Sequence, residues 1–307
     1  MSIETLKSAI QAVADEVGLE IGLSVLQVET GEQFDINGTQ PFPMASVFKI
    51  PVLVTAGQQW QAGKFSLDDR ITMSEESKST GSGILAFFQP GVAPTVRDLL
   101  TLMIIISDNT ATDMSVELVG GPLAVESAMH ALGLTDIFVK MDCKNLLKPL
   151  APAELHDQPI EAIKAWWTNN DILRDGVTFS LESDNNISSA NSMSQLVYRL
   201  FQGELADEAT TAELMRILYT QQLNQRLPKL LPQGVEFAHK TGTIGGYYND
   251  SGVMTVKEDH HVVVTLFTHW DDAAYWQKPV ERVSKSFEVE MAMGKIGRLI
   301  YDHYANV

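Results

Sequence analysis

Apolar side chains recur along this chain with two different periods, and the period changes with position. Residues 2–17 carry apolar positions at helical spacing mixed with acidic ones, which predicts an amphipathic helix. The segments 19–30 and 32–36 are separated by Gly31, so we expect two strands joined by a tight turn. Helical spacing predominates in the middle of the chain, and there we predict helices over 46–62, 95–106, 109–118, 122–132 and 192–202.

A strand-like pattern returns near the C-terminus. A final helical stretch over about 280–303 follows three short β-rich runs, which cover 235–243, 249–256 and 260–268. Strands therefore sit at both ends of the chain, and helices fill the middle. This order predicts an α+β fold, in which one antiparallel sheet formed from both chain ends is flanked by the terminal helices and carries an inserted all-α subdomain.

The same order predicts two subdomains. We expect a sheet subdomain made of residues 1–45 and 204–307, and a helical subdomain made of residues 46–203. Within the latter, the segment 141–191 has the least regular pattern and is too long for a simple connection. We interpret it as a functional loop or a small extra cap.

Charge and hydropathy exclude two classes of partner. The 307 residues carry 22 basic and 39 acidic side chains, a formal net charge of −17. A surface of that sign opposes nucleic acid, because phosphate binding requires a basic patch. No apolar run reaches the roughly 18 residues that a membrane span requires. We expect a monomer that acts on a small molecule.

The cysteine count and the N-terminus bear on the compartment. Cys143 is the only cysteine, so no internal disulfide can form. The first residues lack the basic start and the continuous apolar stretch of a signal peptide. As the sequence stands we expect a cytoplasmic protein, and a periplasmic or secreted one if a leader peptide has been removed.

The first candidate for chemistry is Ser46-Val47-Phe48-Lys49. In a helix that begins near Ser46, positions three apart share a face, so the Lys49 amine can reach the Ser46 hydroxyl. A lysine among apolar neighbours has a lowered pKa and can accept the serine proton. The alternative is a helix N-cap followed by a surface lysine, because this short pattern is common.

The second candidate is Ser107-Asp108-Asn109, which ends the apolar run 99–106. It is followed by Thr110-Ala111-Thr112. The alternative interpretation is an N-cap cluster that opens the next helix.

The third candidate is Lys240-Thr241-Gly242-Thr243, inside a β-rich run. A glycine within a strand indicates close approach of another backbone or of a ligand. A cation and two hydroxyls beside it can hold a substrate carboxylate. The alternative is an edge-strand lysine followed by a turn glycine.

The three patterns together are more specific than any one of them. S-x-x-K, S-D-N and K-T-G occur here in the order found in class A β-lactamases and penicillin-binding proteins, and the chain resembles that family. Segments 81–85, 95–113, 120–122 and 203–205 and the last strands are also similar to it. The resemblance implies an acyl-serine hydrolase with a β-lactamase/transpeptidase-like fold, and it implies neither a metal nor a cofactor.

The resemblance also implies catalytic roles. Ser46 would be the acyl-accepting nucleophile and Lys49 its proton acceptor. Ser107 would pass the proton to the leaving nitrogen, and Lys240 would sustain a positive field. The backbone N–H groups of Ser46 and Thr243 would form the oxyanion hole.

Substrate binding is assigned in the same way. The side chain of Asn109 would hydrogen-bond the substrate's amide, and Thr241 and Thr243 would lie near its carboxylate. Gly242 would allow the strand to approach the ligand.

One motif of the family is missing. Class A β-lactamases carry E-x-x-L-N after S-D-N, and its glutamate activates the water that releases the acyl-enzyme. Cys143 occupies that position here, or Asn145 after a small shift, and neither is a suitable general base. We therefore expect slow deacylation, unless the insert supplies a substitute base such as Glu154 or Glu182; Asp142 and His156 lie close by in sequence but outside the motif.

Four functions remain open on this basis. The first is a β-lactamase, and the second is a D-alanyl-D-alanine carboxypeptidase-like penicillin-binding protein. The third is a cytoplasmic esterase or amidase whose pocket is shaped by the insert 151–190, with Trp166 and Trp167 as candidate lining residues. The fourth is a non-catalytic sensor that is acylated once.

Overall fold

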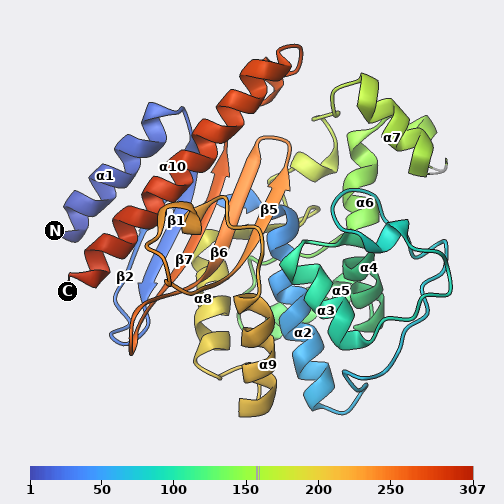
Figure 1. Cartoon of the computed structure of the whole chain (residues 1–307), viewed down its shortest axis with the longest axis horizontal. Helices are drawn as coiled ribbons and strands as arrows, with labels where there is room; N and C mark the ends of the chain where they lie inside the picture. The colour runs from blue at the N-terminus through green and yellow to red at the C-terminus, as the bar shows by residue number, and fades with distance from the viewer. Residues whose placement is uncertain (157, 159, 307) are drawn as a thin grey trace.

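A single antiparallel sheet forms the centre of the computed structural model, which describes residues 1–156, 158 and 160–306 (Figure 1). Its five strands lie in the order β2-β1-β7-β6-β5, and all neighbours are antiparallel. The sheet therefore joins both chain ends, as predicted. The strands are β1 (Glu20–Gln27), β2 (Gln33–Ile36), β5 (Phe237–Ile244), β6 (Tyr247–Lys257) and β7 (His260–His269).

Both faces of this sheet are buried. The terminal helices α1 (Ile3–Glu16) and α10 (Pro279–Ala305) cover one face, and α8 (Ala190–Phe201) packs on the other (Figure 1). Successive side chains of β7 point to opposite faces of the sheet. Val264 belongs to the core under the terminal helices, and Val263 belongs to the core on the helical side.

The rest of the middle of the chain is helical, and the predicted α+β fold is confirmed. Helix α9 was not predicted, although Asp207 caps it by accepting a hydrogen bond from the Thr210 backbone N–H. The subdomain division at residues 46 and 203 stays a prediction. The helices on this side are α2 (Lys49–Gln61), α3 (Val96–Ile105), α4 (Asn109–Leu118), α5 (Pro122–Ala131) and α9 (Glu208–Tyr219), with a 3-10 turn, η2 (Leu85–Phe87).

The predicted helix 46–62 is divided in the structure. It consists of a 3-10 turn, η1 (Ala45–Phe48), followed by α2. Pro51 explains the division, because it lacks an N–H and fits only the first turn of an α-helix that begins at Lys49. The serine of the first motif therefore lies on the 3-10 turn and the lysine at the start of the α-helix.

A small two-stranded sheet fixes the chain that enters η1. Strand β3 (Pro41–Pro43) pairs with β4 (Ile187–Ser189), and the Met44 N–H donates to the Asn186 carbonyl at 2.9 Å. The far end of the irregular segment is thereby attached to the residues immediately before Ser46.

The segment 141–191 contains short helical pieces. Residues 157 and 159 of this predicted cap lie outside the described residues. Helix α7 stands at the margin of the helical side (Figure 1). The pieces before β4 are α6 (Cys143–Leu147), η3 (Lys148–Leu150), η4 (Ala153–Leu155), α7 (Ile160–Asn169) and η5 (Val177–Phe179). Within the described part of the chain, no helix combines the length and the apolar character that a membrane crossing requires.

Candidate active site

Lys49 is the polar centre of the site. Its Nζ donates to the Ser107 carbonyl at 2.8 Å and to Asn109 Oδ1 at 2.8 Å, and it lies 3.0 Å from Ser107 Oγ. The side chain is fully buried. The structure thus brings together one residue of the S-x-x-K motif and two residues of the S-D-N motif.

The hydrogen-bond partners of Lys49 allow its neutral amine to accept a proton. Two of the three are carbonyl oxygens, which only accept, so a neutral amine uses its two hydrogens on them and keeps its lone pair available. Burial lowers the pKa of Lys49, and negative charge at Asp113 and Asp108 opposes that shift in part. The environment therefore favours the neutral amine more than water does.

Ser46 is half-buried on η1, and the backbone around the site is strained. Ala45 has φ +46° and Ser107 has φ +57°, a region that side-chain-bearing residues rarely adopt. The hydrogen bonds found among the described residues do not include one from Ser46 Oγ to Lys49 Nζ. The i,i+3 contact predicted for this pair remains a prediction.

Asp108 and Asn109 hold the S-D-N segment in place. Asp108 caps α4 through the Ala111 N–H, and its second oxygen accepts from the Ile84 and Leu85 N–H groups at 2.7 and 2.8 Å. Asn109 Nδ2 donates to the Thr80 carbonyl at 2.8 Å, which directs Oδ1 toward Lys49. The capping interpretation is therefore correct for Asp108. Ser107 and Asn109 of the same motif contact Lys49.

Strand β5 closes the opposite side. It is an edge strand, yet Lys240 is fully buried and its Nζ donates to the Thr241 carbonyl at 2.7 Å. Burial lowers the pKa of Lys240 well below its usual range, and the nearby Lys49 and Arg226 cations lower it further. This lysine is therefore not the exposed edge residue of the alternative interpretation.

Gly242 explains how β5 approaches η1. A Cβ at this position would lie 2.5 Å from the Met44 carbonyl oxygen and 3.0 Å from the Ser46 backbone nitrogen. Only glycine allows that contact without displacement of one of the two segments. The close backbone approach predicted from this glycine is present, and it sets Thr243 beside η1.

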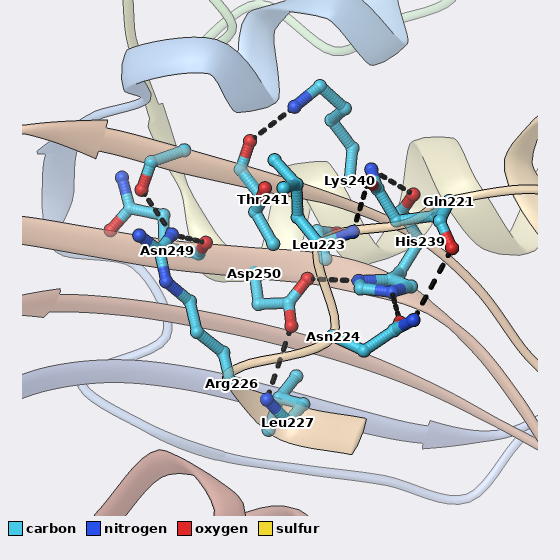
Figure 2. A network of polar contacts seen from close by, with 12 residues as sticks. Gln221, Leu223, Asn224, Arg226, Leu227, His239, Lys240, Thr241, Asn249 and Asp250 are labelled. Carbon is cyan, nitrogen blue, oxygen red and sulfur yellow. Dashed lines mark hydrogen bonds and ion pairs between the residues drawn. The ribbon is translucent and has the colours of Figure 1, made fainter. Parts of the chain in front are cut away.

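A buried polar network begins at His239, the residue of β5 that precedes Lys240 (Figure 2). His239 Nδ1 contacts Asp250 Oδ1 at 2.7 Å, and His239 Nε2 contacts Asn224 Oδ1 at 3.0 Å. The second Asp250 oxygen accepts from the Leu227 N–H at 3.2 Å. In Figure 2, Lys240 points away from this network, as alternation along the strand requires.

Arg226 is a site residue that sequence analysis did not select. Its buried guanidinium donates to the Gly242 and Asn249 carbonyls and to the Thr243 hydroxyl, and its Cζ lies 4.8 Å from the centre of the Tyr248 ring. Burial lowers its pKa. No short motif surrounds this arginine, so only the folded structure shows that it holds the K-T-G edge.

The motif residues surround one cavity of about 210 Å³. We call it the Ser46 cavity. Asn109, Thr241 and Thr243 are on its surface, and Lys240 lies directly behind. Its lining residues are Ala45, Ser46, Phe48, Gly81, Ser82, Ser107, Asn109, Cys143, Leu146, Leu147, Leu223, Thr241, Thr243 and Ile244.

Helix α6 forms the remaining wall. Asp113 on α4 fixes it by accepting from the Cys143 and Lys144 N–H groups at 2.7 and 3.0 Å. Burial raises the pKa of Asp113 to about 6, and the Asp142 charge adds to this shift. Cys143 thus faces the cavity, and burial raises the pKa of its thiol well above the usual value.

The other candidates for water activation lie elsewhere. Asn145, Glu154 and Glu182 are exposed. Asp142 caps α6 by accepting from the Asn145 N–H, and His156 lines a neighbouring cavity. Among the residues that the structure describes, no cluster of three or more His, Cys, Asp and Glu side chains could hold a metal ion.

The fold and the motif cluster define a class of protein first, an α+β hydrolase of the β-lactamase and transpeptidase type. The chain belongs to the β-lactamase enzyme family, whose model matches residues 5–304. The extended-spectrum β-lactamase PER-1 of Pseudomonas aeruginosa is 24% identical over 272 residues, which cover 85% of this chain and 79% of the relative.

Solved structures agree with this assignment. A β-lactamase from Sphaerobacter thermophilus superposes with a TM-score of 0.78 at 26% identity and covers 100% of this chain and 99% of its own. The structure of PBP-A superposes with a TM-score of 0.74 at 23% identity, over 98% and 97% of the two chains, and this likeness concerns the fold.

Proposed function

We propose that this β-lactamase-like hydrolase acts through an acyl-enzyme on Ser46 and releases that acyl-enzyme slowly. Its substrates are β-lactams or similar amides and esters. The observation that carries both parts is the composition of the Ser46 cavity. Ser107, Asn109 and the K-T-G edge line it on one side, with buried Lys49 beside them, and a protonated thiol lines it on the other.

We assign the acylation step to these residues in the roles that the family resemblance implies. The lone pair of Lys49 takes the proton of Ser46 Oγ while that oxygen attacks the substrate carbonyl. When the carbonyl re-forms, the C–N bond breaks, and Ser107 Oγ gives its proton to the leaving nitrogen. Lys49, 3.0 Å from Ser107 Oγ, then returns a proton to Ser107 and is neutral again.

Charge stabilisation is assigned to η1 and β5. The Ser46 and Thr243 N–H groups would receive the negative oxygen of the tetrahedral intermediate, and the contact of Gly242 with η1 supports this pairing. Each such donor contributes about 3–4 kcal/mol in comparable sites. Arg226 supplies a buried positive charge for a substrate carboxylate near Thr241 and Thr243, and Lys240 adds to that field in its protonated form.

For deacylation, no equivalent group lines the Ser46 cavity among the residues that the structure describes. Hydrolysis of the ester at Ser46 requires a base that deprotonates a water, and such a base contributes on the order of 10²–10⁴ in rate. The thiol of Cys143, with its raised pKa, does not serve. The same observation favours a second candidate function, a penicillin-binding protein of the carboxypeptidase type that β-lactams inhibit.

Intact-mass spectrometry with benzylpenicillin tests the proposal. We expect the wild type to gain the mass of one penicilloyl group within minutes and to keep it for hours, and Ser46→Ala to gain nothing. Nitrocefin and p-nitrophenyl esters, assayed in parallel, separate the candidates. Rapid nitrocefin turnover indicates a β-lactamase, a stable adduct a penicillin-binding protein or sensor, and ester cleavage alone an esterase. An adduct on Ser46→Ala would overturn the assignment of the nucleophile.

A further inference from the structure

A second and larger cavity lies beside the Ser46 cavity. It has a volume of about 370 Å³, and helix α7 forms one of its walls. We call it the α7 cavity and define it by Lys78, Lys144, Leu147, Lys148, Lys164 and Trp167. Helix α7 belongs to the segment 141–191, which we interpreted as a functional loop or a small extra cap.

The charge of the α7 cavity is opposite to that of the chain. Four lysines and two glutamates line it, so its formal balance is positive in a protein whose net charge is −17. Lys78 is paired with Glu75 at 2.9 Å, and Lys144 Nζ donates to the Glu76 carbonyl. Lys148 and Lys164 add two further ammonium groups. An anion that the rest of the surface repels is attracted here.

The floor of the α7 cavity is apolar. Ile163 and Trp167 of α7 and Leu147 of α6 line it, and the Trp167 indole is fixed by a hydrogen bond to the Leu150 carbonyl at 3.3 Å. Apolar walls with a few charged groups are typical of small-molecule sites. The cavity therefore suits an alkyl or aryl chain that ends in a negative charge.

Helix α6 lies between the two cavities, and Leu147 is common to both linings. A Cβ on Gly81 would lie 3.2 Å from Leu147 Cδ1. Neighbouring residues point to different sides of this helix, since Cys143 lines the Ser46 cavity and Lys144 the α7 cavity. Leu147 is therefore the point at which a chain that leaves Ser46 toward α6 would enter the α7 cavity.

We propose that the α7 cavity binds the distal, anionic end of the substrate's acyl group. The inference rests on the proposed function: with the leaving group's carboxylate at β5, the acyl group extends toward α6. The substrate class is then an amide or ester of a chain that carries a terminal carboxylate. Lys148 and Lys164 are specificity-determining residues and take no part in bond making.

The test compares two penicillins of equal chain length, the adipoyl and the hexanoyl derivatives of 6-aminopenicillanic acid, which differ in a terminal carboxylate. Because a hydrogen bond to a charged group contributes about 1.5–3 kcal/mol, we expect the wild type to be acylated about tenfold or more faster by the adipoyl compound. Lys148→Gln with Lys164→Gln should remove this preference and leave the hexanoyl rate unchanged. Lys64→Gln, an exposed lysine outside the cavity, should keep it.

Calorimetry on the Ser46→Ala variant keeps the inference separate from the proposed function, because no acylation is needed. Tighter binding of the adipoyl compound, lost when Lys148 and Lys164 are also replaced, supports the α7 cavity even if the wild type is never acylated. Equal binding of the two compounds, or a preference that survives both replacements, overturns it.

Discussion

The two walls of the Ser46 cavity differ in what they provide to a reacting substrate. On the wall of η1, α4 and β5, Lys49 and Lys240 are fully buried and oriented by hydrogen bonds of 2.7–3.0 Å. On the wall of α6, the groups that face the cavity are a thiol and two leucines. In the proposed mechanism the wall of η1, α4 and β5 serves acylation, and the described residues of the α6 wall offer no base for deacylation.

We expect the largest change in rate from a substitution on the first wall, that of η1, α4 and β5. Lys49→Met removes the proposed proton acceptor and keeps an apolar side chain of similar length in a buried position. We expect the second-order rate constant for acylation by benzylpenicillin to fall about 10³- to 10⁴-fold, since general-base catalysis contributes on that scale. Stopped-flow mixing with intact-mass detection measures it, and cooperative thermal unfolding confirms the fold. Acylation at the wild-type rate would refute the assigned role.

The pH dependence of the acylation rate tests the same role of Lys49 as the proton acceptor. Burial lowers the pKa of Lys49, so its neutral form appears at a lower pH than for an exposed lysine. Because only the neutral amine accepts a proton, the acylation rate of the wild type should rise with pH through that lowered pKa and then level off. The residual rate of Lys49→Met should lack this rise.

A single carboxylate on the second wall, that of α6, should accelerate deacylation. Cys143→Glu places a base at a position that faces the Ser46 cavity, and we expect deacylation of the penicilloyl adduct to accelerate about 10²-fold or more. Asn145→Glu is the matched control, because Asn145 is exposed and should give no gain. Decay of the adduct mass after removal of benzylpenicillin gives both rates. Equal rates in the two variants would contradict the account of the α6 wall.

The contrast between the walls also shows what the sequence could predict. Gly242 predicted a close backbone contact, because a glycine inside a strand has few other reasons to be there. The strands and the terminal helices followed from their periodicity. The motifs placed Lys49, Ser107 and Asn109 in one site, and the structure shows these three in contact, whereas the Ser46–Lys49 contact stays a prediction.

Other features depend on contacts distant in the sequence. Arg226 holds Thr243 and Gly242 across a turn and a strand, and no local pattern announces this. Asp113 fixes α6 from 30 positions away. The sequence left Cys143 and Asn145 as equal candidates for the family's glutamate position, and the orientation of α6 separates them, because only Cys143 faces the cavity.

Asp113 offers a test of how α6 is held. Its pKa is raised from 3.8 to about 6, so the folded protein binds this proton more tightly than the unfolded chain does. Its contribution to stability is therefore complete below about pH 4 and is lost as pH rises through 6. The free energy of unfolding of the wild type, relative to Asp113→Asn, should fall by about 3 kcal/mol between pH 4 and pH 7.

Urea denaturation at several pH values measures this difference. Asparagine does not titrate, so the variant removes the pH-dependent part and keeps an acceptor for one of the two α6 N–H groups. A difference that stays constant from pH 4 to pH 7 would show that Asp113 titrates as an exposed carboxyl does.

The smallest effect is expected at Arg226, which supports the first wall without lining it. Its guanidinium spans two carbonyls and the Thr243 hydroxyl, and a lysine cannot occupy that fork. Arg226→Lys keeps the positive charge but releases Thr243, so we expect acylation by benzylpenicillin to slow about tenfold, the loss of roughly one hydrogen bond to a charged group. Arg216→Lys, on the exposed face of α9, should leave the rate unchanged. If Arg226→Lys also leaves the rate unchanged, the buried charge alone suffices, and the geometry of the fork has no part in the difference between the two walls.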